Sequence, residues 1–189
     1  MFRSVLMVLM VGIIGMSLGG CGMEKQVVND LKVEVFQAEV ATVNSYFVHN
    51  EEEGILIDLL RSSEEAKELV KFVKGFDVKL SRIVVTHGHP DHYIGLDVLT
   101  EAFPETPVYV YDQSVKNDII GFSTWMESVG WLDNEPALKV KSAENKDGFD
   151  YENIIQVETE KSFTFAKGNV IEFNTDYKAT EAESLTTMY

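Results

Sequence analysis

Residues 87–92 read His-Gly-His-Pro-Asp-His, which places three of the four histidines of this chain and an aspartate within six residues. Imidazole and carboxylate side chains bind zinc-like cations at neutral pH. The run directly follows residues 83–86, a β-branched segment that is typical of a buried strand. Ligands that follow a strand are held by a rigid element and face an open edge of the sheet. We therefore expect a metal site here, with a coordination position left open for water or substrate.

The spacing within this run indicates how ligands would be shared. Residues two apart point in the same direction in an extended segment, so His87 and His89 can approach one cation together. Pro90 then turns the chain, and Asp91 and His92 present ligands on a different face. Two adjacent cations held in this way can lower the pKa of a shared water and polarise the bond to be cleaved.

Apolar periodicity and turn residues predict an α/β arrangement for the chain. The runs around the polar turn at 50–54 favour a hairpin. Residues 139–151 are polar and are expected to form a surface loop, and His49 is expected to be a plain surface histidine. Strands are predicted at 31–38, 43–49, 55–58, 82–86, 108–111, 154–157, 162–166, 170–173 and 185–189, and helices at 62–75, 94–103 and 113–130.

The helix predicted at 113–130 carries large apolar residues at helical spacing, among them Ile119, Phe122 and Val129. Packing in the core is the favoured interpretation. The alternative is a lid, in which Trp125, Met126 and Trp131 form an apolar wall over the site. Nothing in the pattern of residues 113–160 identifies a substrate.

The first twenty residues have the features of a secretory signal. Arg3 precedes an almost wholly apolar stretch from Val5 to Leu18, which is too short to span a bilayer comfortably. Residues 18–21 read Leu-Gly-Gly-Cys and resemble a bacterial lipobox, in which the cysteine is lipidated. Cys21 is the only cysteine of the chain, so no disulfide can form within it.

These features predict a bacterial lipoprotein anchored to a membrane outside the cytoplasm, in the periplasm or on the cell surface, through a lipid on Cys21. Residues 1–20 would be the signal peptide, 21–30 a tether and 31–189 the folded domain. An ordinary signal peptide or an N-terminal membrane helix is the alternative. The net charge of −15 opposes binding to nucleic acid and to anionic membrane surfaces, so a small-molecule substrate is expected.

Residues 86–92, Thr-His-Gly-His-Pro-Asp-His, closely resemble the T-H-x-H-x-D-H signature of the metallo-β-lactamase superfamily. The resemblance covers residues 31–111 well and the remainder loosely. It implies an αββα sandwich of the α/β (α+β) class and one or two zinc ions, although a mixed nitrogen and oxygen ligand set also suits iron or manganese. It further implies hydrolysis of an ester, thioester, lactone, lactam or phosphoester by a metal-bound hydroxide.

The same resemblance implies roles for individual residues. His87 and His89 would bind the first metal, and Asp91 and His92 would bind the second. Asp91 would also orient the attacking water. Asp58 would lie beneath the site and support its ligands. Without the resemblance, Asp58 would be interpreted as a turn residue at the end of a strand.

The resemblance is incomplete downstream, where the superfamily usually supplies a histidine, a bridging aspartate and a final histidine. No histidine follows His92 in this chain. Asp176 and Glu181 could each offer a carboxylate, but a solvated acidic loop is the favoured interpretation of both. We therefore expect a sandwich whose second half is incomplete, as in a truncated chain. An inactive metal-binding relative that retains half of the site is the alternative function, and a nuclease is disfavoured by charge and export signal.

Overall fold

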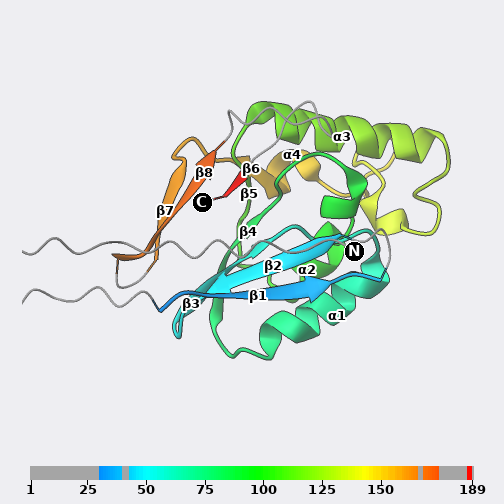
Figure 1. Cartoon of the computed structure of the whole chain (residues 1–189). Coiled ribbons are helices and arrows are strands. Elements are labelled where there is room, and N and C mark those ends of the chain that lie inside the picture. The colour runs from blue at the N-terminus through cyan, green and yellow to red at the C-terminus, as the bar shows by residue number, and fades with distance from the viewer. Residues whose placement is uncertain (1–29, 40–42, 166–167, 175–186, 189) are drawn as a thin grey trace, which may run out of the picture.

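The computed structural model describes residues 30–39, 43–165, 168–174 and 187–188 (Figure 1). Six strands form one mixed sheet in the order β1-β2-β3-β4-β5-β6. The first three strands pair antiparallel, and β3 to β6 pair parallel. Their bounds are β1 Lys32–Gln37, β2 Asn44–His49, β3 Glu53–Ile57, β4 Lys79–Val84, β5 Val108–Val110 and β6 Ile155–Val157.

Helices connect the parallel strands, as parallel pairing requires. Their bounds are α1 Ser63–Lys74, α2 Leu96–Ala102, α3 Gln113–Ser128 and α4 Tyr151–Ile154, with short 3-10 helices η1 at Pro90–His92 and η2 at Pro136–Leu138. The hydroxyl of Ser62 caps α1 by accepting from the backbone N–H of Glu65, and Gly75 ends the helix. The three predicted helices and the predicted hairpin are therefore confirmed, whereas α4 and the two 3-10 helices were not predicted.

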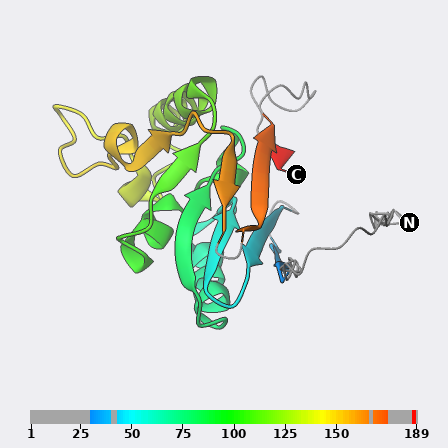
Figure 2. The same ribbon diagram turned by 90° about the vertical axis from the view of Figure 1, so that its left-hand side faces the viewer.

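The sheet has a different layer on each face (Figure 2). One face packs against α1, α2 and α3, and residues such as Leu56 point into that core. The opposite face carries Ile55 and Ile57 into a second core, beneath a smaller sheet in the order β7-β8-β9. The bounds of that sheet are β7 Ser162–Thr164, β8 Val170–Asn174 and β9 Thr187–Met188. Alternation along β3 explains both layers, because successive residues of a strand face opposite sides.

The prediction that the apolar residues of the 113–130 helix pack in the core is only partly correct. Ile119 and Met126 are buried, which confirms core packing for them, but Phe122, Trp125 and Val129 are 37%, 45% and 47% exposed. The core stripe of the helix is thus narrower than the apolar spacing suggests. The lid interpretation is wrong for Met126, because that side chain lies in the core.

Two further expectations are corrected. His49 is buried and its ring stacks on Phe47 at 4.9 Å, because both side chains lie on the same face of β2 and pack against the helical layer. The expected surface loop at 139–151 contributes buried aromatic side chains, Phe149 and Tyr151. Its backbone also closes on itself, since Lys141 N–H donates to the carbonyl of Phe149.

The signal peptide, Cys21 and the tether up to residue 29 lie outside the described residues, as do Asp176 and Glu181, and these expectations remain predictions. Among the helices that are described, none combines the length and apolar character needed to cross a membrane.

Candidate metal centre

The candidate ligands lie at the C-terminal edge of the parallel strands, in the segment that joins β4 to α2. This segment packs against the turn that follows β3, through two backbone hydrogen bonds. Asp58 N–H donates to the carbonyl of Val84 at 2.9 Å, and Leu59 N–H donates to the carbonyl of His92 at 2.8 Å. Asp58 and Leu60 both have left-handed backbone conformations, with φ of 61° and 71°. Such strain persists only where surrounding contacts hold it, and it is common at functional sites.

The buried carboxylate of Asp58 organises the site. One oxygen, Oδ1, accepts from the backbone N–H of Thr86 at 2.9 Å. The other oxygen, Oδ2, lies 2.8 Å from the Thr86 hydroxyl and 2.7 Å from Nδ1 of His92. A carboxylate only accepts hydrogen bonds, so both of these groups donate to it. Nδ1 of His92 therefore carries the proton, and the ring adopts the tautomer with its lone pair on Nε2.

The tautomer of His87 follows from its hydrogen bond to Thr86. The Thr86 hydroxyl gives its one proton to Asp58, so its oxygen is left to accept from Nδ1 of His87 at 3.0 Å. His87 then also presents its lone pair on Nε2. One carboxylate thus sets the tautomer of two histidines, which is the arrangement that metal-binding imidazoles require.

The three rings lie in one group. Ring centroids of His87 and His89 are 4.9 Å apart, and those of His87 and His92 are 3.9 Å apart. Two imidazoles on one tetrahedral zinc ion have centroids roughly 5 Å apart, given a Zn–N distance of about 2.1 Å. The His87–His89 spacing therefore suits one shared ion, whereas His87 and His92 lie too close together for that geometry.

The surroundings of His87 favour its neutral form. Burial is the main cause that lowers the pKa of His87 to about 4, so this ring is neutral at pH 7. A neutral ring is the form that binds a metal. The carboxylate of Asp91, about one-third exposed, lies 3.8 Å from Nε2 of His92 and adds an oxygen ligand on that side.

The donor atoms and tautomers of these residues fit a zinc-like ion. As the side chains stand, however, no group of three or more His, Cys, Asp or Glu residues in the described part of the chain is arranged to hold an ion. The predicted site residues His87, His89, Asp91, His92 and Asp58 are thus all brought together, but a closed ligand set is not formed among them.

Sequence reasoning missed three contributors to this region. Thr86 belongs to the recognised run, but its role as a relay between Asp58 and His87 depends on the fold. The buried hydroxyl of Ser45 lies 2.7 Å from the carbonyl of Asp58 and donates to it, which helps to hold the strained turn. Gly88 packs so closely on α3 that a Cβ there would lie 2.4 Å from Cβ of Asp118. These roles have no signal at sequence level, because they depend on contacts with Asp58 and Asp118, which are distant along the chain.

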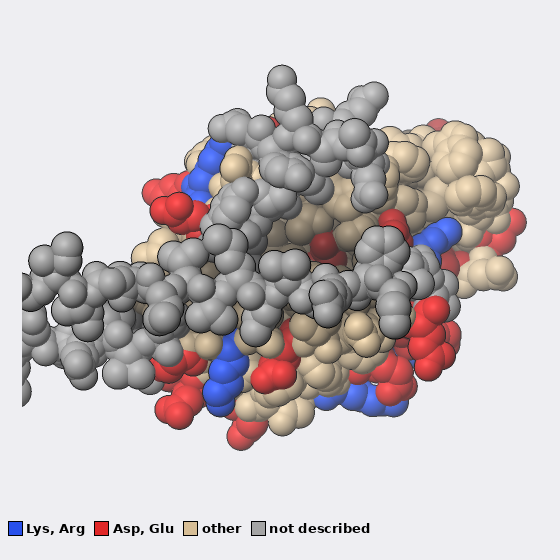
Figure 3. All heavy atoms as spheres, in the orientation of Figure 1, with Lys and Arg blue, Asp and Glu red and all other residues tan. Residues whose placement is uncertain are grey.

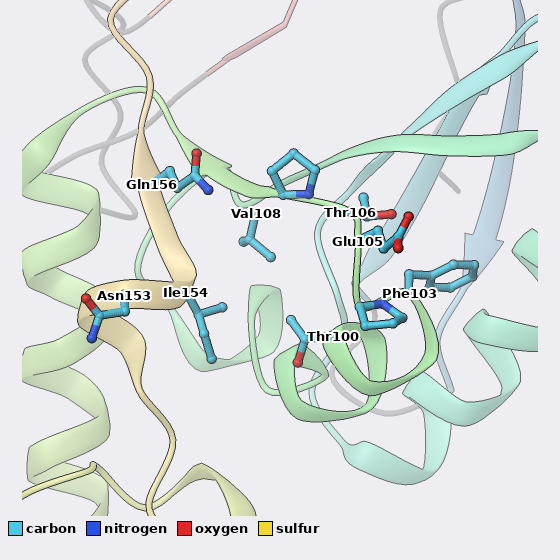
Figure 4. A pocket seen from close by; sticks show the side chains of 10 residues that line it. Thr100, Phe103, Glu105, Thr106, Val108, Asn153, Ile154 and Gln156 are labelled. Atoms are coloured by element: carbon cyan, nitrogen blue, oxygen red, sulfur yellow. The ribbon is translucent and has the colours of Figure 1, made fainter.

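A cavity of about 290 Å³ lies elsewhere, at the N-terminal ends of β5 and β6 (Figure 4). This is the sheet edge opposite to the histidines. Some of its polar side chains already serve the fold, since the Thr106 hydroxyl donates to the carbonyl of Leu80 and the Asn153 amide donates to Asp150. We therefore assign the candidate chemistry to the histidine edge.

Comparisons with known proteins identify the family of this chain. Residues 38–150 match the family model described as Metallo-beta-lactamase superfamily. A probable metallo-hydrolase of Streptococcus pyogenes is 35% identical over 74 residues, which are 39% of this chain and 31% of that protein. A hydroxyacylglutathione hydrolase of Francisella philomiragia is 36% identical over 66 residues, which are 35% of this chain and 25% of that protein. The matches thus span a third or less of these curated relatives.

Among solved structures, the fold resembles the BLEG-1 B3 metallo-beta-lactamase. The TM-score is 0.52 at 17% sequence identity, over 84% of this chain and 66% of that chain. At this identity the likeness concerns the fold alone, and it agrees with the predicted fold class.

Proposed function

Because the chain belongs to the metallo-β-lactamase superfamily, we propose that it is a metal-dependent hydrolase that cleaves an ester, thioester, lactone or lactam with metal-activated water. The observation that carries the proposal is the carboxylate of Asp58, which sets the tautomers of His87 and His92 through direct and relayed hydrogen bonds. The relatives include a hydrolase of hydroxyacylglutathione, which supports a thioester as one of the candidate bonds.

We propose His87 and His89 as ligands of one zinc ion, and Asp91 and His92 as ligands on the neighbouring side. When bound, zinc lowers the pKa of a water ligand toward neutrality and polarises the bond to be cleaved. Burial holds the His87 ring neutral, and hydrogen bonds to Thr86 and Asp58 fix the protons of His87 and His92 on Nδ1. Asp91, about one-third exposed, is positioned to accept a proton from water at the mouth of the site.

Metal removal tests the proposal. Turnover of p-nitrophenyl acetate and of a small acyl thioester should fall at least tenfold after dialysis against a chelator and return when zinc is added. We expect this result because the bound metal would supply the activated water that attacks the scissile bond. Turnover that is unchanged by the chelator would contradict the metal-dependent reaction.

The second candidate is a metal-binding relative without catalysis. It is favoured by the lack of a closed three-ligand group among the described residues. A protein that binds zinc stoichiometrically but turns over neither substrate would support this candidate over the hydrolase.

Asp58→Asn tests the positioning of the ligands. An asparagine accepts the left-handed backbone readily, but its Nδ2 would donate toward Nδ1 of His92 and force the proton onto Nε2. We expect the affinity for zinc to fall about 10- to 100-fold while the protein still folds. Competition with a chromophoric chelator measures the affinity.

Asp77→Asn is a matched control, because Asp77 is also an aspartate with a left-handed backbone, at φ of 53°, but it is exposed after α1. It should bind zinc as the parent protein does. Equal zinc affinity of Asp58→Asn and Asp77→Asn would refute the role of Asp58.

A further inference from the structure

A row of exposed aromatic rings starts at the candidate metal centre and runs outward along α3. The rings of His89 and Phe122 are 5.7 Å apart, those of Phe122 and Trp125 are 6.4 Å apart, and those of Trp125 and Trp131 are 4.9 Å apart. Phe122, Trp125 and Trp131 are 37%, 45% and 58% exposed. We call these three residues the aromatic row. Its inner end, Phe122, lies beside the predicted metal ligand His89, so the row is continuous with the reacting centre.

The aromatic row is held at a fixed position relative to the ligands. α3 meets the histidine segment where Gly88 packs against Asp118, an approach too close for any side chain at residue 88. One turn further along, the buried hydroxyl of Ser123 donates to the hydroxyl of Tyr93, which follows η1 directly. These contacts join the helix to the ligand segment, so the rings form a preorganised surface.

The charges around the row favour an uncharged ligand. Along α3, the exposed stripe from Phe122 to Val129 presents apolar side chains, and the surface over the end of this helix is mostly uncharged in the view of Figure 3. Lys139, the basic residue at this end, is paired with Asp133 at 2.9 Å. With a net charge of −15 on the whole chain, an anionic group would be repelled.

We propose that the aromatic row is the subsite for an uncharged apolar part of the substrate, such as an acyl chain or a ring, whose scissile bond lies at His89. This inference rests on the proposed hydrolase function and narrows its substrate class. Aromatic side chains supply large apolar contact areas, and each methylene that is removed from water favours binding.

A binding test does not depend on turnover. Trp125 and Trp131 are the two tryptophans of the chain, so its tryptophan fluorescence reports on the row alone. An uncharged brominated probe, 8-bromooctanamide, should quench this emission by contact, and the anion 8-bromooctanoate should bind at least tenfold more weakly. Phe122→Ala should weaken the amide about tenfold. Tyr46→Ala, which removes a 38% exposed aromatic ring from β2, should leave the quenching unchanged.

A kinetic test compares p-nitrophenyl octanoate with p-nitrophenyl acetate. The ratio of their kcat/KM values should exceed tenfold in the parent protein and should fall about tenfold in Trp125→Ala, but not in Tyr46→Ala. Amide quenching without turnover would support the subsite while the hydrolase proposal failed.

Three results would overturn the inference and leave the hydrolase proposal standing. These are the absence of quenching by the amide at millimolar concentration, equal quenching by amide and anion, and a concentration-dependent dimer whose formation Trp131→Ala abolishes. The last result would show that a second copy of the chain covers the row.

Discussion

Replacing His87 and His89 together by alanine should remove bound zinc almost completely. Their ring centroids are 4.9 Å apart, the spacing of two imidazoles on one ion, and burial keeps His87 neutral and ready to bind. Loss of even a supporting partner costs a metal site about 10- to 100-fold in affinity, so loss of two direct ligands should cost roughly 1000-fold or more. Atomic absorption on protein that has been dialysed against zinc measures the change.

The fourth histidine provides the control. His49 lies in the helical core against Phe47, and its Nδ1 is 3.0 Å from the carbonyl of Asn50, so it has no part in the site. His49→Gln should therefore retain zinc at the level of the parent protein. If the double variant also retains it, the metal lies elsewhere and the proposed ligands are wrong.

The second large effect is expected at Gly95, which precedes α2 and lies three residues after His92. A Cβ at this position would lie 2.3 Å from the carbonyl oxygen of Leu59 and 2.8 Å from Cβ of Ala66. The backbone of Leu59 cannot move away from such a contact as the end of a flexible side chain could. Gly95→Ala should reduce the free energy of unfolding by about 2–3 kcal/mol, measured by urea denaturation.

The same substitution should also weaken zinc binding. Leu59 N–H donates to the carbonyl of His92, so moving the Leu59 backbone moves the ligand segment with it. Gly121→Ala is the matched control, because nothing lies within 4 Å of a Cβ there and alanine is the better helix former. It should raise stability by about 0.5–1 kcal/mol. If Gly95→Ala is as stable as the parent protein, Gly95 does not pack against Leu59 and Ala66 in this way.

Local patterns accounted for most of the secondary structure. The period of apolar residues places α1, and the hydroxyl of Ser62 and Gly75 set its ends, because capping depends on residues only a few positions away. The ligand strand is less well placed. It runs from Lys79 to Val84 and ends two residues before the predicted end, because pairing with β3 and β5 decides where a strand stops.

Burial was harder to predict than secondary structure. His49 was predicted to lie at the surface because it is polar, but it lies on the face of β2 that packs toward α1 and is therefore buried. The apolar spacing in α3 does not distinguish Met126, which is in the core, from Trp125, which is exposed. Which part of an apolar stripe is covered depends on the width of the contact that the neighbouring layer makes.

The sequence by itself determined the candidate ligands, because His87, His89, Asp91 and His92 are close along the chain and their chemistry is that of a metal site. It also determined the family and the fold class. Only the tertiary structure decided that the Asp58 carboxylate contacts both Thr86 and His92. It also decided that the aromatic row starts beside His89. These contacts join residues about 30 positions apart, and their geometry depends on how β3, β4 and α3 pack.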